Sequence, residues 1–479
     1  MRNLPLGEFL ACVLCLVPAV TAWRVFHPGL LDTDTADVYQ QAVTGIYHDW
    51  HSPPFVVAMA ACLKLGVSFK HLAILLAASL SVGVYRLASV ALAVAWGGLP
   101  AWLRRSLAVC VPFLLCAPIT PFSYWMVFVS SQGISAALVV WIAALSGEAF
   151  AASPDALPRR RYAAYLFALI ASLAMLRPNM VLIVPVLALV PAFVLWPLGK
   201  LSACFTALAL VVAPVAVTDV ILNRFEFIRW HPEDQVMALD LVGLCNRVPE
   251  ARHDFPFTDA MLLEDRYKTE YTPGFVNPMF FWHPRTLVKP GYLQWENHAK
   301  LRADYRIALA KYKPELLRLK WDAYLKAFDE PAWWGAQSAN NDFALEFRPK
   351  YAEERKQLND ELLRLGNHER WRWVSGKHAV WAIASLVLGA VAILNLLARR
   401  SRRAIAFAAM LAVPVLVYAA YLPCTVAPFF RYLYPATLAV QVVAMGLTLG
   451  VVPAVIGAVA RRLVGHAPRP AVEPLRLAA

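Results

Sequence analysis

Two stretches decide the fold of this chain: LSACFTALALVVAPVAVTDVIL at residues 201–222 and HAVWAIASLVLGAVAILNLLA at residues 378–398. The first has a single charge, Asp219, near its end, and the second has no Lys, Arg, Asp or Glu. A helix needs about 20 mostly apolar residues to cross the hydrocarbon core of a bilayer. Both stretches have that length and are therefore predicted to be transmembrane helices.

Other apolar segments of similar or slightly shorter length lie on both sides of these two. They cover residues 5–26, 71–96, 106–120, 122–146, 162–176, 179–197, 404–422 and 431–460. Segment 5–26 is interpreted as an uncleaved first helix. Segment 53–66 is apolar but too short for a full crossing, which predicts a short or re-entrant helix. The expected fold is an all-α polytopic membrane protein with about 10–12 transmembrane helices.

The charges support this fold class and suggest a topology. The chain is 59% hydrophobic and 16% charged, whereas soluble domains carry about 25% charged residues. The net charge is +13, and much of the basic excess lies in short loops at Arg104–Arg105, Arg159–Arg161, Arg399–Arg403 and Arg461–Arg462. Such loops are typical of the cytoplasmic side, so the positive charge does not indicate a nucleic-acid partner.

This topology divides the chain into three parts. Residues 1–222 form an N-terminal transmembrane module whose first external loop is 27–54. Residues 223–377 form a large external segment, and residues 378–479 hold the last transmembrane helices and a cytoplasmic tail. Cys245 and Cys424 lie in or beside the predicted external regions, where a disulfide between them is one alternative and two free thiols the other.

The first external loop, LLDTDTADVYQQAVTGIYHDWHSPP at residues 30–54, carries acids at the membrane boundary. Ionisable groups there are costly and usually functional. Spacing predicts a short interfacial helix over residues 34–47, with Val38, Ala42 and Ile46 on one face. A carboxylate in this loop is suited to act as a general base toward an acceptor hydroxyl or amine.

Asp32-Thr33-Asp34 in the same loop is an Asp-x-Asp pair. Such a pair offers hard oxygen ligands to a divalent cation such as Mg²⁺ or Mn²⁺. The alternative is a solvated acidic loop in which Asp34 or Thr35 caps the helix. The sequence leaves open whether a metal is required.

The layout of this loop resembles the GT-C superfamily of membrane glycosyltransferases, which includes the protein O-mannosyltransferases and the lipid A aminoarabinose transferases. The matching residues are Asp34, Tyr39, Ala42 and His51-Ser52-Pro53-Pro54. The chain departs from the family pattern in having Asp34-Thr35 in place of Asp-Glu and in the serine before the prolines. The resemblance implies a catalytic base among three acids. In order of preference for the first two, these are Asp34, Asp32 and Asp37.

Two arginines interrupt apolar stretches at the predicted outer face. Arg177 precedes Pro178-Asn179, and Arg431 begins the sequence Arg-Tyr-Leu-Tyr-Pro, residues 431–435. The planar fork of an arginine grips two phosphate oxygens at once. The resemblance implies that both residues, with Tyr432, contact a lipid-phosphate donor. A helical hairpin with a snorkelling arginine is the alternative for Arg177.

The external segment is predicted to be mostly helical. Residues 313–328 and 348–373 have apolar positions at helical spacing. Asp240 lies inside an apolar run, and the resemblance suggests a place for it at the active site. A helix cap or a structural ion pair is the alternative.

The resemblance implies a glycosyltransferase that moves a sugar from a polyprenyl-phosphate donor to an acceptor glycan, lipid or protein at the external face. A bacterial inner membrane with a periplasmic site is the expected setting. The expected substrate-binding residues are His51, Tyr39, Arg177, Arg431, Tyr432 and Asp240. A transporter or flippase of a lipid-linked sugar, and a non-catalytic subunit of a glycan assembly complex, are the alternative functions.

Overall fold

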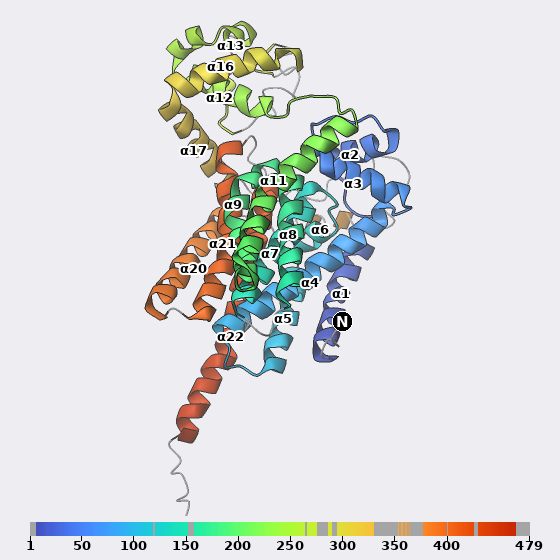
Figure 1. The fold of residues 1–479 in the computed structure, drawn as a ribbon, viewed down its shortest axis with the longest axis vertical. Coiled ribbons are helices and arrows are strands. Elements are labelled where there is room, and N and C mark those ends of the chain that lie inside the picture. The colour runs from blue at the N-terminus through green and yellow to red at the C-terminus, as the bar shows by residue number, and fades with distance from the viewer. Residues whose placement is uncertain are drawn as a thin grey trace, which may run out of the picture.

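The computed structural model describes most of the 479-residue chain. The described residues are 6–117, 120–151, 158–263, 266–274, 286–289, 295–329, 377–399, 401–425 and 430–465, with isolated positions between 353 and 364. Within them the chain is all-α: a bundle of long helices lies below a smaller helical layer (Figure 1). The predicted fold class is thus confirmed. The helix expected over residues 348–373 falls mainly outside the described residues.

Eight helical stretches among the described residues are long and apolar enough to cross a membrane. They are α1 (Leu6–Val25), α4 (Phe69–Ala95), α7 (Ser131–Ala151), Pro178–Leu198, α11 (Lys200–Arg224), α20 (His378–Arg399), α21 (Arg402–Ala420) and α22 (Phe430–Gly465). The shorter α5 (Ala101–Leu115) and α8 (Arg159–Leu176), whose first turn is Arg-Arg-Arg, pack among them. The chain is an integral membrane protein by this criterion.

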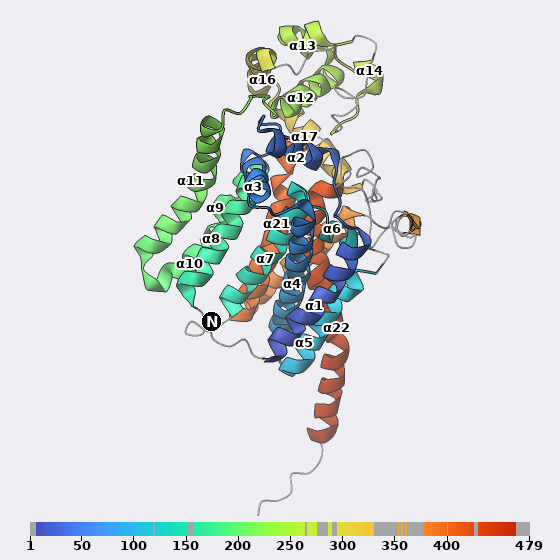
Figure 2. The same cartoon turned by 90° about the vertical axis from the view of Figure 1, so that its right-hand side faces the viewer.

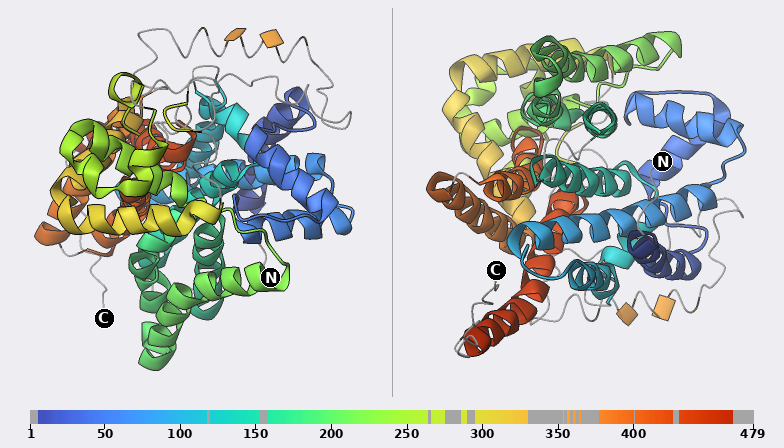
Figure 3. Two further views of the ribbon diagram at one scale, coloured as in Figure 1. Left: turned by 90° about the horizontal axis from the view of Figure 1, so that it is seen from above. Right: turned by 60° about the horizontal axis from the view of Figure 1, so that its bottom comes forward.

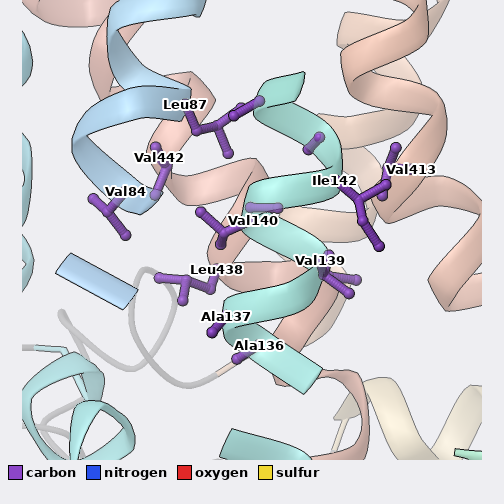
Figure 4. Packing of buried hydrophobic residues seen from close by; sticks show 14 of the residues in the cluster. Val84, Leu87, Ala136, Ala137, Val139, Val140, Ile142, Val413, Leu438 and Val442 are labelled. Atoms are coloured by element: carbon purple, nitrogen blue, oxygen red, sulfur yellow. The ribbon is translucent and has the colours of Figure 1, made fainter. Parts of the chain in front are cut away.

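The apolar core lies where α7 crosses α4, α21 and α22. Figure 4 shows this contact, in which Val139, Val140 and Ile142 of α7 meet side chains of the other three helices. At the edge of the bundle α11 and α20 are mostly exposed (Figure 3): only 11% of the most apolar stretch of each helix is buried. Exposed apolar helix faces of this kind are what lipid requires.

Several charges within the bundle form ion pairs. Arg86 in the middle of α4 bonds Glu8 of α1 at 2.8 Å and also contacts Glu148 of α7. Arg105 of α5 lies 3.3 Å from the second oxygen of Glu8. Because an isolated charge is costly inside a membrane, these pairs explain how Glu8 and Arg86 interrupt otherwise apolar helices.

Basic loops and the acidic first loop lie at opposite ends of the bundle. Arg403 lies against Gly97, so the loop before α21 and the loop before α5 are neighbours. The opposite end carries α2 (Thr33–Thr44) and α3 (Pro53–Lys64), and above it lies a layer formed by the described residues between 226 and 329 (Figures 1 and 2). α3 has only 12 residues, as its short apolar segment predicts.

Three local expectations need correction. The first-loop helix ends at Thr44, because Gly45 adopts the left-handed conformation (φ 74°) that terminates it. Ile46 is therefore 64% exposed and does not join Val38 and Ala42 on the buried face. The N-cap of this helix is Asp32, not Asp34 or Thr35. The apolar run 122–146 is also interrupted: α6 (Phe122–Met126) ends before α7 begins.

The helical layer consists of α12 (Asp234–Arg247), α13 (Pro256–Met261), α14 (Tyr267–Glu270), α16 (His298–Lys311) and α17 (Lys313–Asp329), with short 3-10 turns at Pro249–Asp254 and Trp295–Asn297. It has its own apolar core around Leu241, Leu244 and Leu301. The helix predicted from residue 313 corresponds to α17. Cys245 and Cys424 are both free thiols, which answers the question that the sequence leaves open.

Candidate active site

The first loop is held against the bundle by backbone hydrogen bonds. The Leu30 N–H donates to Val127 O at 3.0 Å, between α6 and α7. At the other end of the loop, Ile228 donates to Tyr47 O at 2.9 Å and Asp49 donates to Ile228 O at 3.1 Å. The loop is thus tied both to the bundle and to the chain that leaves α11, which fixes where its acids lie.

Asp32 and Asp34 both bind Arg431. One guanidinium nitrogen, Nη1, lies 2.8 Å from Asp32 Oδ2, and Nη2 lies 2.8 Å from Asp34 Oδ2. The other Asp32 oxygen accepts from the backbone N–H of Thr35 (2.8 Å) and from its hydroxyl (2.6 Å), which caps α2. The positive charge at this Asp-x-Asp pair therefore comes from an arginine 399 positions away in sequence.

Burial differs between these acids. The side chain of Asp32 is 18% exposed and that of Asp34 is 36% exposed. Burial raises the pKa of Asp32, and the neighbouring Asp34 adds to this, while Arg431 and the hydrogen bonds from Thr35 oppose the rise. Asp34 is the acid of this pair that a substrate can reach more easily.

Arg177 joins the same cluster through two aromatic rings. It follows the last residue of α8 in extended conformation. Its guanidinium carbon lies 5.3 Å from the centre of the Tyr432 ring and 5.9 Å from that of Tyr421. Arg431 lies 5.4 Å from the same Tyr432 ring. One tyrosine thus brings together the two arginines that the sequence singles out, at distances typical of cation–π contacts.

The guanidinium of Arg177 is only weakly hydrogen-bonded. Among the described residues, its buried Nε and Nη2 have no hydrogen-bond partner of normal geometry. The nearby Tyr421 hydroxyl interacts with both the Arg177 guanidinium and the Asn179 side chain. Buried donors without a well-formed partner are rare and costly, so an additional acceptor atom beside Arg177 would stabilise it.

Asp37 belongs to a different group of side chains. Its Oδ2 accepts from His48 Nε2 (3.2 Å), His51 Nε2 (3.1 Å) and Gln41 Nε2 (2.9 Å). Partial burial raises the pKa of Asp37, but the hydrogen bonds from the two histidines lower it by more. The pKa of Asp37 therefore lies below its ordinary value of 3.8. A carboxylate of this kind is a weak base, and Asp37 instead fastens residues 48–51 to α2.

The aromatic side chain of Trp230 covers this second group. Its ring stacks on His48 with centres 4.1 Å apart, and its backbone N–H donates to the Asp49 carboxylate at 2.6 Å. Sequence reasoning missed Trp230, Gln41 and Tyr421 as neighbours of the site. Only Gln41 had a signal, because it lies one helical turn after Asp37.

The remaining expected site residues lie in different surroundings. Tyr39 is partly buried against the apolar face shared by α2 and α3. Asp240 lies in α12, where its Oδ1 is 2.9 Å from Lys320 of α17 and its Oδ2 accepts from Tyr305 of α16 at 2.9 Å. Asp240 thus joins three helices of the upper layer through an ion pair and a hydrogen bond. A structural ion pair was one of the alternatives to an active-site role for this residue.

The fold and the cluster define a polytopic helical membrane protein with paired acids and arginines at one end of its bundle. No family model, curated protein or solved structure matches the chain. Its function is therefore argued from the geometry of this cluster.

Proposed function

We propose that this protein is a GT-C-type glycosyltransferase that moves a sugar from a polyprenyl-phosphate donor to an acceptor at the external face of the membrane. One observation carries the proposal: two guanidinium groups flank the Tyr432 ring directly beside the Asp32–Asp34 pair. Arginines of this kind suit a phosphate, and carboxylates beside them suit a proton acceptor. A lipid-linked phosphate reaches such a cluster sideways from the bilayer.

In this mechanism the donor phosphate competes with Asp34 for Arg431. The Arg431–Asp34 contact is the more exposed of the two ion pairs, and exposed pairs contribute only about 0.2–1 kcal/mol. A phosphodiester placed between Arg431 and the weakly bonded Nε and Nη2 of Arg177 replaces that contact and accepts from buried donors. Donor binding thereby releases the Asp34 carboxylate.

The released carboxylate then acts as the general base. Asp34 takes the proton of the acceptor hydroxyl or amine, whose heteroatom forms a bond to the anomeric carbon. The bond between that carbon and the phosphate oxygen breaks, and polyprenyl phosphate leaves with the electron pair. Arg431 and Arg177 stabilise the charge that grows on the leaving phosphate. Asp32 stays buried as a cap and counter-ion, and Asp37 stays bound to its histidines.

Asp34→Asn tests the assignment. Purified protein in detergent or nanodiscs is given a panel of radiolabelled polyprenyl-phosphate sugars with membrane extract as the acceptor source, and binding of undecaprenyl phosphate is followed by native mass spectrometry. We expect transfer to be lost. Lipid-phosphate binding should tighten by about 1.4- to 5-fold, because a competitor worth about 0.2–1 kcal/mol is removed. Transfer at the normal rate by this variant would refute the role of Asp34.

Asp37→Asn is the matched control, since it removes a carboxylate from the same helix without touching Arg431. It should keep lipid-phosphate affinity unchanged. Arg431→Ala and Arg177→Ala should both weaken that affinity.

The alternative functions make different predictions for the same variants. A flippase of a lipid-linked sugar needs the arginines but no base, so Asp34→Asn would still move the lipid between leaflets of a vesicle. A non-catalytic subunit would bind the lipid but would not turn over any donor without a partner. Turnover by the purified wild-type protein excludes the second alternative.

A further inference from the structure

Two arginines meet at the basic end of the bundle, away from the candidate active site. Arg104 lies in the first turn of α5 and Arg403 in the first turn of α21. Both guanidinium groups contact Gly97, which belongs to the loop between α4 and α5. Segments that are far apart in the chain therefore place two cations on one residue.

The two guanidinium groups approach Gly97 in different ways. Arg104 Nη1 donates to Gly97 O at 3.0 Å and to Leu99 O at 2.8 Å, and these two bonds fix the side chain. The Arg403 guanidinium lies over the position that a Cβ atom of residue 97 would take, with Cζ at 2.7 Å, Nη2 at 2.7 Å and Nη1 at 2.8 Å from it. The absence of a side chain at Gly97 is therefore what leaves room for this cation.

The charges of this arginine pair are not balanced by acids. Among the described residues, neither Arg104 nor Arg403 has a carboxylate within ion-pair distance, whereas the next residue, Arg105, lies 3.3 Å from Glu8. Two like charges beside one residue repel each other, so an anion between them would stabilise the pair. A phosphate suits this position, because a guanidinium group offers a planar fork of donors to its oxygens.

The surroundings of the pair are those of a membrane interface. Trp102, two residues before Arg104, is 65% exposed, and Leu397, close to the end of α20, is 71% exposed. Tryptophan is typical of the level of lipid headgroups, and an exposed leucine on a membrane-spanning helix is suited to contact with acyl chains. A phospholipid can therefore supply the phosphate here, with its acyl chains against the exposed apolar helices.

We propose that Arg104 and Arg403 bind the headgroup phosphate of an acidic phospholipid, between the loop before α5 and the loop before α21. The phosphate accepts from the Arg403 guanidinium and from the nitrogens of Arg104 that do not bind the backbone carbonyls. Basic pockets between membrane helices bind acidic headgroups in this way. The lipid fastens α21 to α4 and α5 at the end of the bundle opposite the first loop. The proposal is independent of the glycosyltransferase assignment.

Gly97→Ala separates such a site from the general attraction between a basic membrane protein and acidic lipid. The new Cβ displaces the Arg403 guanidinium, which is the far end of a flexible side chain, and leaves every charge in the protein. Delipidated full-length protein in detergent is titrated with phosphatidylglycerol or with phosphatidylcholine of the same acyl chains, and the first bound lipid is measured by native mass spectrometry. We expect the wild type to prefer phosphatidylglycerol. Gly97→Ala should weaken that binding by about 5-fold, which corresponds to about 1 kcal/mol for one basic residue.

Gly98→Ala is the matched control, because a Cβ at that residue meets no atom within 4 Å, and it should keep wild-type affinity. Arg403→Gln should weaken phosphatidylglycerol binding as Gly97→Ala does, whereas Arg160→Gln, which removes an exposed charge in the first turn of α8, should not. Equal affinity of the wild type for the two lipids, equal effects of Arg403→Gln and Arg160→Gln, or wild-type affinity in Gly97→Ala would overturn the proposal. Displacement of phosphatidylglycerol by inorganic phosphate at the same concentration would also overturn it, because the site would then be one for a soluble anion.

Discussion

Arg431→Ala gives the most direct test of the acid–arginine cluster. The substitution leaves the Asp32 carboxylate, 18% exposed, without its cation. The cost has an upper limit, because the stranded acid can take up a proton. At pH 7, protonating a group of ordinary pKa 3.8 costs about 1.36 × 3.2, or about 4.4 kcal/mol. The more exposed Asp34 adds at most about 1 kcal/mol. We therefore expect a loss of stability of about 3–5 kcal/mol.

This cost should depend on pH in a defined direction. Each unit by which the pH falls makes protonation of the stranded Asp32 cheaper by about 1.4 kcal/mol, so the deficit of Arg431→Ala should shrink from pH 7 to pH 5. The double variant Asp32→Asn/Arg431→Ala should recover much of it at pH 7, because no uncompensated charge remains. The assay is thermal unfolding in detergent by intrinsic fluorescence at both pH values.

The control for this experiment is an exposed ion pair with a nearly equal N–O distance. Arg247 lies 2.9 Å from Asp322, but the two side chains are 39% and 47% exposed. Arg247→Ala should change the melting temperature little, since exposed ion pairs contribute weakly. Equal effects of Arg431→Ala and Arg247→Ala, or an Arg431→Ala deficit that is unchanged at pH 5, would refute the reasoning.

Three further predictions concern other parts of the chain. Asp37→Asn should lower the melting temperature at pH 7. The pKa of Asp37 lies below its ordinary value, so the stability that its carboxylate contributes is complete above about pH 4 and is lost as the pH falls further. The difference in melting temperature from the wild type should therefore narrow at pH 3. Gly450→Ala should destabilise the contact between α22 and α4, since a Cβ there would lie 2.1 Å from Trp96 Cδ1, whereas Gly389→Ala, with open space around it, should not; thermal unfolding of both variants compares them. Cys245 and Cys424 should each be alkylated by maleimide in unfolded protein without reductant, and protection of the pair would show a disulfide.

The sequence predicts the membrane helices well because one local property, the length of an apolar run, determines them. Segment 53–66 was correctly expected to be short for the same reason. The predictions fail where a single residue changes the backbone, as at Gly45, which ends α2 and leaves Ile46 exposed. They also fail where a long apolar run is interrupted, as between α6 and α7.

The sequence singles out the residues of the candidate site, but it does not predict the contacts between them. Arg431, Arg177 and the first-loop acids stand out because charges near a membrane are rare. Which acid meets which base depends on contacts between distant segments, and no local pattern records them. Asp37 was one of the three candidate bases, behind Asp34 and Asp32, and it binds two histidines rather than an arginine.

The charges of the cluster suit the proposed reaction for a reason that no single residue reveals. Arg431 lies in the first turn of α22, where a cation opposes the helix dipole, so it needs acidic neighbours. Two aspartates and two arginines make the resting cluster neutral. During transfer the phosphate changes from a diester to a monoester and gains one negative charge. Asp34 takes up one proton and so loses one negative charge. The total charge is unchanged, and Arg431 exchanges a carboxylate for a phosphate. The contact with Asp34 at rest thus keeps the arginine neutralised until a donor arrives.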